Sequence, residues 1–275
     1  KWTAPMASDA FRDTDSPEPR TDKPVDGETA GHGDNQSTGR VIEVALERFS
    51  RLPFSEAKLD SIARNAGMSK RMIHYYFGDK RGLYQAALTE AVRLLQPAEE
   101  AMHVDSAIPV EGVSTIIDAL HEQFLAHPEA VKMIQMENVQ RVLNLSELSP
   151  LVDHTPVLLN LDRLLLLGQD SGAFRPGISA FDVYFLVFAL LARRVTDQAT
   201  ALNLYGADLS TERNIAGTRR MAVDVVLAFL TANIPDDGHE SYLDSSASPA
   251  GGEQDAGPTP SIYGEDDSSS SVIYG

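Results

Sequence analysis

A run of basic and aromatic residues is the part of this sequence whose types and spacing could do chemistry. Over residues 62–83 the chain reads IARNAGMSKRMIHYYFGDKRGL, with Lys70, Arg71, Lys80 and Arg81 around a His-Tyr-Tyr-Phe cluster. Ammonium, guanidinium and tyrosine hydroxyl groups are side-chain groups that bind nucleic-acid phosphates. The run therefore predicts binding of a polyanion rather than a bond-breaking reaction.

The overall charge of the chain does not exclude such a partner, because the charge is unevenly distributed. The 275 residues carry a formal net charge of −17, yet residues 38–93 hold ten Lys and Arg against six Asp and Glu, which gives +4. Residues 1–37 sum to −4 and residues 235–275 sum to −9. Salt screens charges beyond about 8–10 Å, so a bound phosphate would respond to the local excess of cations.

Several classes of protein are disfavoured by what the sequence lacks. The chain has no cysteine, which excludes disulfides, thiolate nucleophiles and cysteine-bound zinc. Its scattered histidines, among them His103, His121, His127 and His154, have no metal-ligand spacing, and no nucleophile-elbow, phosphate-loop or dinucleotide fingerprint occurs. We therefore predict no metal site, no cofactor and no enzymatic activity.

The sequence predicts no segment that inserts into a membrane, and it predicts no packed structure at either end of the chain. The N-terminus lacks the apolar core of a secretory signal, and the apolar run 185–192 is too short to cross a bilayer. We expect a cytoplasmic protein. Residues 1–37 and 236–275 are acidic and poor in aliphatic side chains, which predicts a disordered arm and a disordered tail. The repeated SIYG and SVIYG of the tail fit either a docking motif or plain unstructured chain.

Between these ends the apolar residues recur at helical spacing, and no segment alternates like a strand, so the predicted class is all-α. About nine helices are expected, the first of them after Thr38 as a possible cap. The expected helices cover residues 41–49, 59–65, 70–77, 80–102, 113–124, 129–145, 158–167, 180–202 and 213–232.

A helix-turn-helix occupies residues 59–77 of this pattern. Gly67 suits the left-handed conformation that ends the first helix, and Ser69 is a good cap for the second. Ile73 and Phe77 lie four residues apart and should face inward, which leaves a polar leading edge at Ser69, Lys70, Arg71 and Met72. A major groove admits such a helix by its N-terminal residues. The alternative interpretation is two packed helices with a solvated basic rim.

The residues from Ile42 to Leu88 resemble the N-terminal domain of the tetracycline-repressor (TetR) family. The matching positions run in the order and spacing of the family motif and are Ile42, Ala45, Phe49, Ile62, Ala63, Ala66, Gly67, Met68, Ser69, Lys70, Tyr76, Phe77, Lys80 and Leu83. The resemblance implies a helix-turn-helix DNA-binding domain over residues 38–88. It also implies a helical effector-binding and dimerisation domain over residues 89–235.

The resemblance also implies roles for individual residues. Lys70, Arg71 and Met72 would face base edges or nearby phosphates, while His74, Tyr75 and Lys80 would hold the DNA backbone. Two positions depart from the family pattern. His74 stands where the family commonly has a phosphate-binding Tyr, so that contact could depend on pH or move to the next residue. A proline, at position 53, stands where a Gly commonly ends the first helix.

For the C-terminal domain, the resemblance implies a dimer built from the last two long helices and a ligand pocket. The apolar stretches 181–191 and 221–230 are our candidates for the dimer interface. Aromatic and Met side chains at helical spacing fit either a plain core or a ligand pocket. The pocket candidates are Phe124, Met133, Met136, Glu137, Asn138, Arg141, Arg163, Leu164, Tyr184, Phe185 and Phe188.

Two of these candidates carry opposite charges and have two interpretations. Glu137 and Arg141 lie four residues apart, which is the spacing of an ordinary surface ion pair. If both instead face an apolar cavity, they would suit a phenol or another small hydrogen-bonding aromatic molecule.

The function predicted from the sequence is that of a ligand-responsive transcriptional repressor. A homodimer would hold two recognition helices on a palindromic operator in double-stranded DNA, and a small organic effector would release it. The helix from Lys80 to Met102 would couple the two domains. Two alternatives stay open. One is an activator or an effector-independent DNA binder, and the other is an all-α small-molecule enzyme that uses the basic helix for an anionic cofactor.

Overall fold

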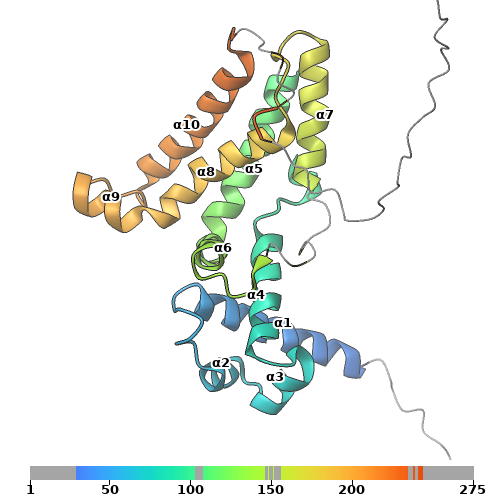
Figure 1. The fold of residues 1–275 in the computed structure, drawn as a ribbon, viewed down its shortest axis with the longest axis vertical. Coiled ribbons are helices and arrows are strands. Elements are labelled where there is room, and N and C mark those ends of the chain that lie inside the picture. The colour runs from blue at the N-terminus through green and yellow to red at the C-terminus, as the bar shows by residue number, and fades with distance from the viewer. Residues whose placement is uncertain are drawn as a thin grey trace, which may run out of the picture. The chain divides into compact units, whose positions relative to one another are not determined.

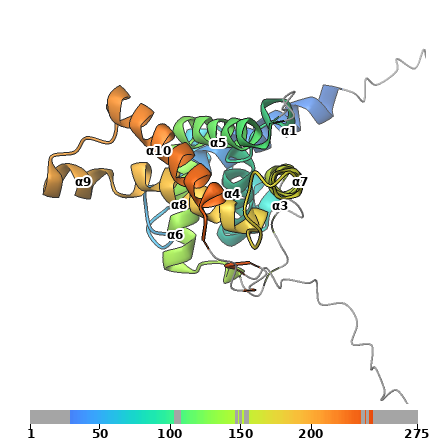
Figure 2. The ribbon, with the colours of Figure 1, turned by 90° about the horizontal axis from the view of Figure 1, so that it is seen from above.

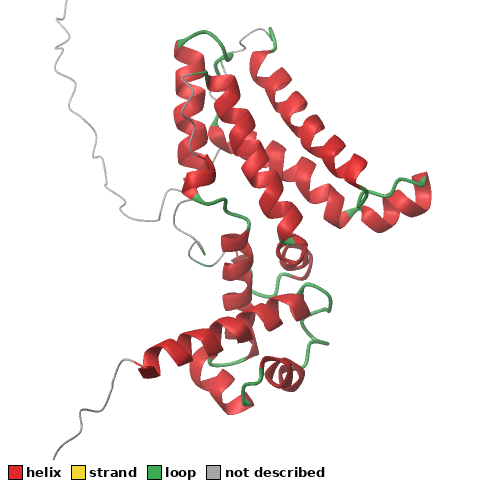
Figure 3. Cartoon of the chain, turned by 180° about the vertical axis from the view of Figure 1, so that it is seen from behind, coloured by secondary structure: helices red, strands yellow, loops and turns green. Residues whose placement is uncertain are grey.

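The computed structural model describes residues 29–102, 108–145, 148, 151, 156–234, 238 and 241–243. Residues 1–28 of the predicted arm, His103, His154 and the two tail repeats lie outside the described residues. Within them the regular secondary structure is helical throughout, so the all-α prediction is confirmed (Figure 3). No helix of this part is both long enough and apolar enough to span a membrane.

The described residues form ten α-helices, which are labelled in Figure 1, and one 3₁₀ helix. They are α1 (Thr29–Phe49), α2 (Leu59–Ala66), α3 (Lys70–Phe77), α4 (Lys80–Leu94), η1 (Glu99–Met102), α5 (Pro109–Ala126), α6 (Pro128–Gln140), α7 (Pro156–Asp170), α8 (Ala180–Thr196), α9 (Gln198–Tyr205) and α10 (Glu212–Thr231).

The chain divides into two compact units. One contains α1 to α4 together with α6, and the other contains η1 and α7 to α10. The boundary falls inside α5, after Glu122. Helix α6 is therefore part of the same unit as the helix-turn-helix. Whether the functional domains divide at residues 88 and 89 stays a prediction.

Three aromatic rings form the centre of the first unit. The ring of Phe49, at the end of α1, lies 4.9 Å from that of Tyr84 on α4, edge to face. Phe54, from the loop after α1, lies 5.2 Å from the Tyr84 ring and 5.9 Å from the Phe49 ring. Val41 and Ala45 are fully buried on the same face of α1 as Phe49, at the predicted helical spacing. Pro53 opens the connecting turn, where its carbonyl accepts hydrogen bonds from the N–H groups of Glu56 and Ala57.

Three predicted helix boundaries are wrong, each for a local reason. Helix α1 starts at Thr29 rather than after Thr38, so it includes residues 29–37 of the predicted disordered arm; adding turns to an existing helix costs far less than nucleating one. Helix α4 ends at Leu94 rather than near residue 102, because Pro97 follows and has no N–H to donate. Helix α6 ends at Gln140 rather than at residue 145, because Arg141 adopts a left-handed conformation.

The second unit is organised around α8, which contacts α7, α9 and α10. Figure 2 shows α10 lying across α8. Apolar residues four positions apart are buried on both helices, namely Val183, Val187 and Leu191 on α8 and Ala222, Val226 and Leu230 on α10. The single helix predicted over residues 180–202 is in fact α8 and α9, which meet at Asp197; this break raises the number of α-helices in the described residues to ten.

The predicted disordered tail also differs from the structure at three residues. Ser241, Tyr242 and Leu243 are described and are held against the second unit. The backbone N–H groups of Tyr242 and Leu243 donate to the Asp182 carboxylate at 3.3 and 2.8 Å. The acidic average of the tail conceals this short apolar pair.

Candidate nucleic-acid interface

The turn between α2 and α3 depends on a glycine in a left-handed backbone conformation. Gly67 has φ of 69°, a left-handed value that side chains with a Cβ adopt at a cost. The N–H of the next residue, Met68, then returns to the carbonyl of Ala63 at 3.0 Å and closes the end of α2. This confirms the helix end predicted at Gly67.

Helix α3 begins with a side-chain cap, as predicted. The Ser69 hydroxyl accepts a hydrogen bond from the N–H of Met72 at 3.2 Å. Ile73 is fully buried and fixes the inner face of the helix. These contacts leave the N-terminal turn of α3 pointing away from the core of its unit.

Helices α3 and α4 approach so closely that one position tolerates no side chain. The Asp79 carboxylate caps α4 by accepting from the N–H of Gly82 at 2.8 Å. A Cβ added to Gly82 would lie 2.0 Å from the carbonyl oxygen of Phe77, far inside van der Waals contact. The glycine therefore permits the tight corner that holds α3 on α4.

Five of the seven predicted DNA-binding residues form an exposed surface at the start of α3. Ser69, Lys70, Arg71 and Met72 are exposed along the first turn, and Tyr75 follows with 77% of its surface exposed. Lys70 forms an ion pair with Asp60 of α2 at 3.1 Å, and both groups are exposed. Exposed pairs contribute only about 0–1 kcal/mol, so this contact would yield to a phosphate.

His74, the sixth predicted residue, is exposed and makes a bond within the turn after α3. Its Nδ1–H donates to the carbonyl of Gly78 at 2.8 Å. A neutral imidazole with its proton on Nδ1 has an acceptor at Nε2. That atom could donate to a phosphate only after protonation. The pH-sensitive DNA contact predicted for this residue stays a prediction.

Lys80, the seventh, lies apart from the others. Its ammonium group donates to the carbonyl of Phe54 and lies 4.4 Å from the centre of the Phe54 ring. Partial burial lowers the pKa of Lys80 below its ordinary value. In this structure the residue joins α4 to the loop after α1, and its predicted phosphate contact would require the side chain to leave that site.

A second basic feature was missed in the sequence. Arg40 and Arg48 of α1 and Arg51, two residues after its end, surround a hollow of about 130 Å³ that Glu47 of α1 and Asn65 of α2 also line. The Nε of Arg48 is buried there without a hydrogen-bond partner. The local charge of +4 includes these residues, but the sequence does not show which arginines gather on one side of α1.

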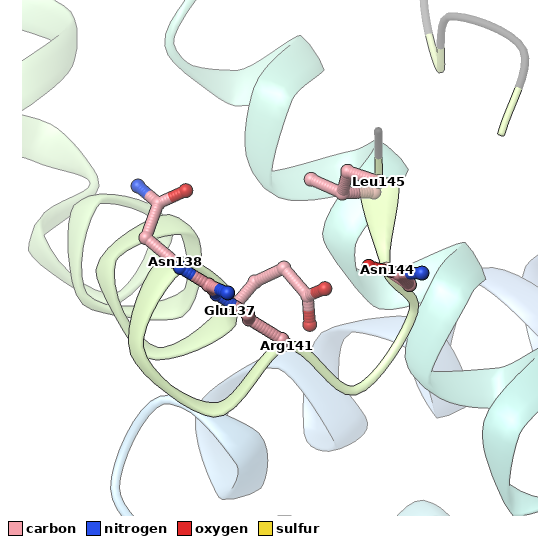
Figure 4. Close-up of a pocket in the computed structure, with 5 residues that line it drawn as sticks. All are labelled: Glu137, Asn138, Arg141, Asn144 and Leu145. Atoms are coloured by element: carbon pink, nitrogen blue, oxygen red, sulfur yellow. The ribbon is translucent and has the colours of Figure 1, made fainter. Parts of the chain in front are cut away.

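The clearest pocket among the ligand candidates lies at the end of α6, within the first unit. It has a volume of about 370 Å³ and is lined by Glu137, Asn138, Arg141, Asn144 and Leu145, drawn in Figure 4. Three of these were predicted to bind ligand, and two were not. Arg141 and Asn144 both have positive φ, 52° and 55°, a conformation that non-glycine residues adopt at a cost and that is common near functional sites.

The surface ion pair considered for Glu137 and Arg141 is wrong. Glu137 is only 2% exposed, and its carboxylate accepts hydrogen bonds from the N–H groups of Val142 at 3.2 Å and Leu143 at 2.9 Å. Burial, together with the charge of this carboxylate, raises the pKa of the nearby Tyr84. Glu137 therefore holds the loop after α6 beside α4.

The remaining ligand candidates are divided between the two units. Phe124 and Met133 are buried in the first unit, where Met136 is half-buried. The second unit contains the others: Arg163 and Phe185 are exposed, Leu164 is buried, and Tyr184 and Phe188 are half-buried. Burial raises the pKa of Tyr184. Ligand binding by these residues stays a prediction. In the described part of the chain, no three His, Asp or Glu side chains gather in a way that could hold a metal ion.

Comparison with known proteins gives a consistent result across both units. Residues 41–87 match the family described as bacterial regulatory proteins, tetR family, and residues 109–226 match the tetracyclin repressor-like C-terminal domain. The chain is 23% identical over 194 residues to the HTH-type transcriptional repressor NicS of Pseudomonas putida, covering 70% of this chain and 92% of that protein.

Solved structures show the same fold. The protein SCO4942 of Streptomyces coelicolor superposes with a TM-score of 0.50 at 24% identity, covering 70% of this chain and 98% of that one. The fatty acid degradation regulator FadR of Bacillus halodurans superposes with a TM-score of 0.52 at 17% identity, covering 70% of this chain and 94% of that one. The capped, exposed α3 and the two family matches support one assignment: this chain belongs to the TetR family and is a transcription regulator with an N-terminal DNA-binding domain.

Proposed function

We propose that the protein represses transcription as a homodimer on a palindromic operator and that a small organic effector releases it. The observation that carries this proposal is the exposed surface of α3. Lys70, Arg71 and Tyr75 are exposed on a helix whose inner face is fixed by Ile73. A DNA major groove admits such a helix by its N-terminal turn, so these side chains would meet base edges and phosphates.

A dimer is expected because one short recognition helix reads few base pairs. Two copies related by a two-fold axis read both halves of a palindrome. The interface proposed from the sequence is supported by apolar side chains exposed on α8 and α10. Phe185 is 55% exposed, and Met221 and Val225 are exposed as well. Pairing these surfaces between two copies would remove them from water.

The pocket at the end of α6 is the proposed effector site. Four of its five lining side chains are polar, which suits a small hydrogen-bonding molecule. The loop that forms it is bound to α4, because Arg81 donates to the carbonyl of Leu143 at 3.2 Å. Helix α4 also packs on α3. An effector that repositions this loop would act on the recognition helix through α4, with a coupling free energy of about 1–3 kcal/mol.

The first experiment selects bound duplexes from a random DNA pool and titrates the winner by electrophoretic mobility shift. We expect a palindromic consensus bound far more tightly than a scrambled duplex. Arg71→Ala should weaken binding and reduce the salt slope by about one unit for each phosphate that the variant no longer binds. Arg213→Ala removes an exposed arginine from α10 and is the matched control.

The same duplex then tests the effector. Small phenols and related compounds are screened for release of the protein from its operator, and Asn138→Ala and Asn144→Ala should raise the concentration needed. A non-palindromic winner, or equal affinity for the scrambled duplex, would refute the dimeric repressor. Release that is unchanged in both pocket variants would refute the effector site alone.

A further inference from the structure

The C-terminal segment 241–243 is bound by a set of residues that the DNA-binding function does not use. We propose that Arg175, Asp182 and Phe229 form a peptide-binding site whose occupant is this chain's own Tyr242-Leu243 segment. The docked segment acts as a strap between the start of α8 and the end of α10. We call these five residues the C-terminal clasp. The family match ends at residue 226, before this segment.

The buried carboxylate of Asp182 binds the backbone of the segment. Asp182 is only 5% exposed and lies in the first turn of α8, where its Oδ2 accepts from the N–H and hydroxyl of Ser179 at 2.9 and 3.0 Å. Those bonds complete the helix cap. The hydrogen bond to the other oxygen, Oδ1, comes from the N–H of Leu243 at 2.8 Å, and the N–H of Tyr242 also reaches Oδ2 at 3.3 Å. Two consecutive peptide N–H groups therefore bind one buried carboxylate.

Arg175 binds both the end of α10 and the side chain of Tyr242. Its backbone N–H donates to the carbonyl of Leu230 at 2.9 Å, and its Nε–H donates to the carbonyl of Phe229 at 2.8 Å. Carbonyls in the last turn of a helix have no partner within the helix, so Arg175 stabilises this end. The guanidinium then donates to the Tyr242 hydroxyl at 3.0 Å.

The Tyr242 ring completes an aromatic site around that guanidinium. Its centre lies 5.4 Å from that of the Phe229 ring, and the Arg175 guanidinium lies 4.7 Å from the Phe229 ring centre and 5.5 Å from the Tyr242 ring centre. Arginine over aromatic faces is a favourable arrangement. Tyrosine side chain and peptide backbone are thus recognised by separate groups, as expected of a site that binds a particular sequence.

Removal of the segment would uncover the groups that it binds. The Asp182 carboxylate would exchange two peptide donors, at 2.8 and 3.3 Å, for water. Phe229 would lose the ring that covers it. The strap therefore stabilises the pairing of α8 with α10, because it binds a residue at the first turn of one helix and a residue at the last turn of the other.

The direct test is hydrogen exchange at the Tyr242 and Leu243 amides of the full chain, followed by mass spectrometry or NMR. We expect exchange at least about tenfold slower than in an unstructured peptide, since both N–H groups are hydrogen-bonded. Tyr242→Ala should abolish that protection and lower Tm by about 2–4 °C. Tyr205→Ala, at an 80% exposed tyrosine on α9, should change neither. Exchange of both amides at the unstructured rate in the unmodified chain would overturn the proposal.

A pair of truncations separates the clasp from the rest of the tail. A chain ending at Ser246 keeps the clasp and should retain the Tm of the full chain, whereas a chain ending at Glu240 should lose the same few degrees as Tyr242→Ala. A synthetic peptide of residues 239–246, HESYLDSS, should restore Tm to the shorter chain, and the same peptide with alanine in place of the tyrosine should not. Equal Tm for the two truncations would show that the segment contributes nothing to stability.

Discussion

At the scale of single residues, Glu137 is a buried carboxylate that holds the loop after α6. Both of its oxygens accept peptide N–H groups in a buried place. Glu137→Gln replaces one acceptor with an NH₂ that would face a donor, so we expect a loss of about 1–3 kcal/mol in unfolding free energy. Denaturant unfolding measures this. Glu56→Gln, at an exposed position of the same unit, is the control; equal losses in both variants would contradict the role given to Glu137.

We expect His121 to make stability depend on pH. It is 7% exposed on α5, with a buried Nε2 that has no hydrogen-bond partner. Burial lowers the pKa of His121, and so do Arg194 of α8 and Arg219 of α10, against the opposing charges of Asp118 and Glu122. The unfolded chain therefore takes up the proton first as pH falls through about 6.5.

The sign of the effect follows. The contribution of neutral His121 is fully present above about pH 6.5 and is lost as pH falls below it, with a slope of at most about 1.4 kcal/mol per pH unit. We expect Tm to fall less between pH 7.5 and 5.5 in His121→Gln than in the unmodified chain. Identical pH profiles for the variant and the unmodified chain would show that His121 does not titrate differently on folding.

At the scale of elements, the corner between α3 and α4 decides whether the recognition helix is presented correctly. Gly82→Ala places a Cβ 2.0 Å from the Phe77 carbonyl oxygen, and that oxygen belongs to the backbone and cannot rotate away. We expect a loss of about 1–3 kcal/mol in stability and a larger loss of operator affinity. Gly39→Ala on α1 meets no atom within 4 Å and should be neutral or stabilising by up to about 1 kcal/mol. Unchanged operator affinity in Gly82→Ala would refute this corner as a positioning device.

The elements also show what sequence can predict. The end of α2 at Gly67 and the cap of α3 at Ser69 were predictable because their signals lie within a few residues of the structure that they specify. The position of Lys80 was not, because its partner Phe54 is 26 residues away and is brought close only by packing. The position of Glu137 was not predictable either. Its four-residue spacing to Arg141 suggested an ion pair on one helix, but the helix ends before Arg141, which adopts a left-handed conformation. The docking of Tyr242 was not predictable, because the sequence around it is acidic and of low complexity, which indicated disorder.

At the scale of the whole molecule, charge is the property that the individual helices do not reveal. The segments outside residues 29–243 are acidic, while residues 38–93 carry +4. An anionic segment competes with DNA for a basic surface. We expect a chain trimmed to residues 29–243 to bind scrambled DNA about tenfold more tightly at low salt, as measured by fluorescence anisotropy. A full-length chain with the same acidic residues changed to Asn and Gln separates charge from length. Unchanged affinity in both would refute competition by the acidic segments.

The boundary inside α5 has a consequence for how such regulators can be recombined. Because α6 belongs to the compact unit of α1 to α4, the unit that contains the helix-turn-helix is not one continuous stretch of sequence. A single crossover after residue 95 would transplant four helices without the fifth, and would separate Tyr84 from its own Glu137. A chimaera that exchanges operator preference between relatives would need two inserts, residues up to 95 and residues 123–153, inherited together.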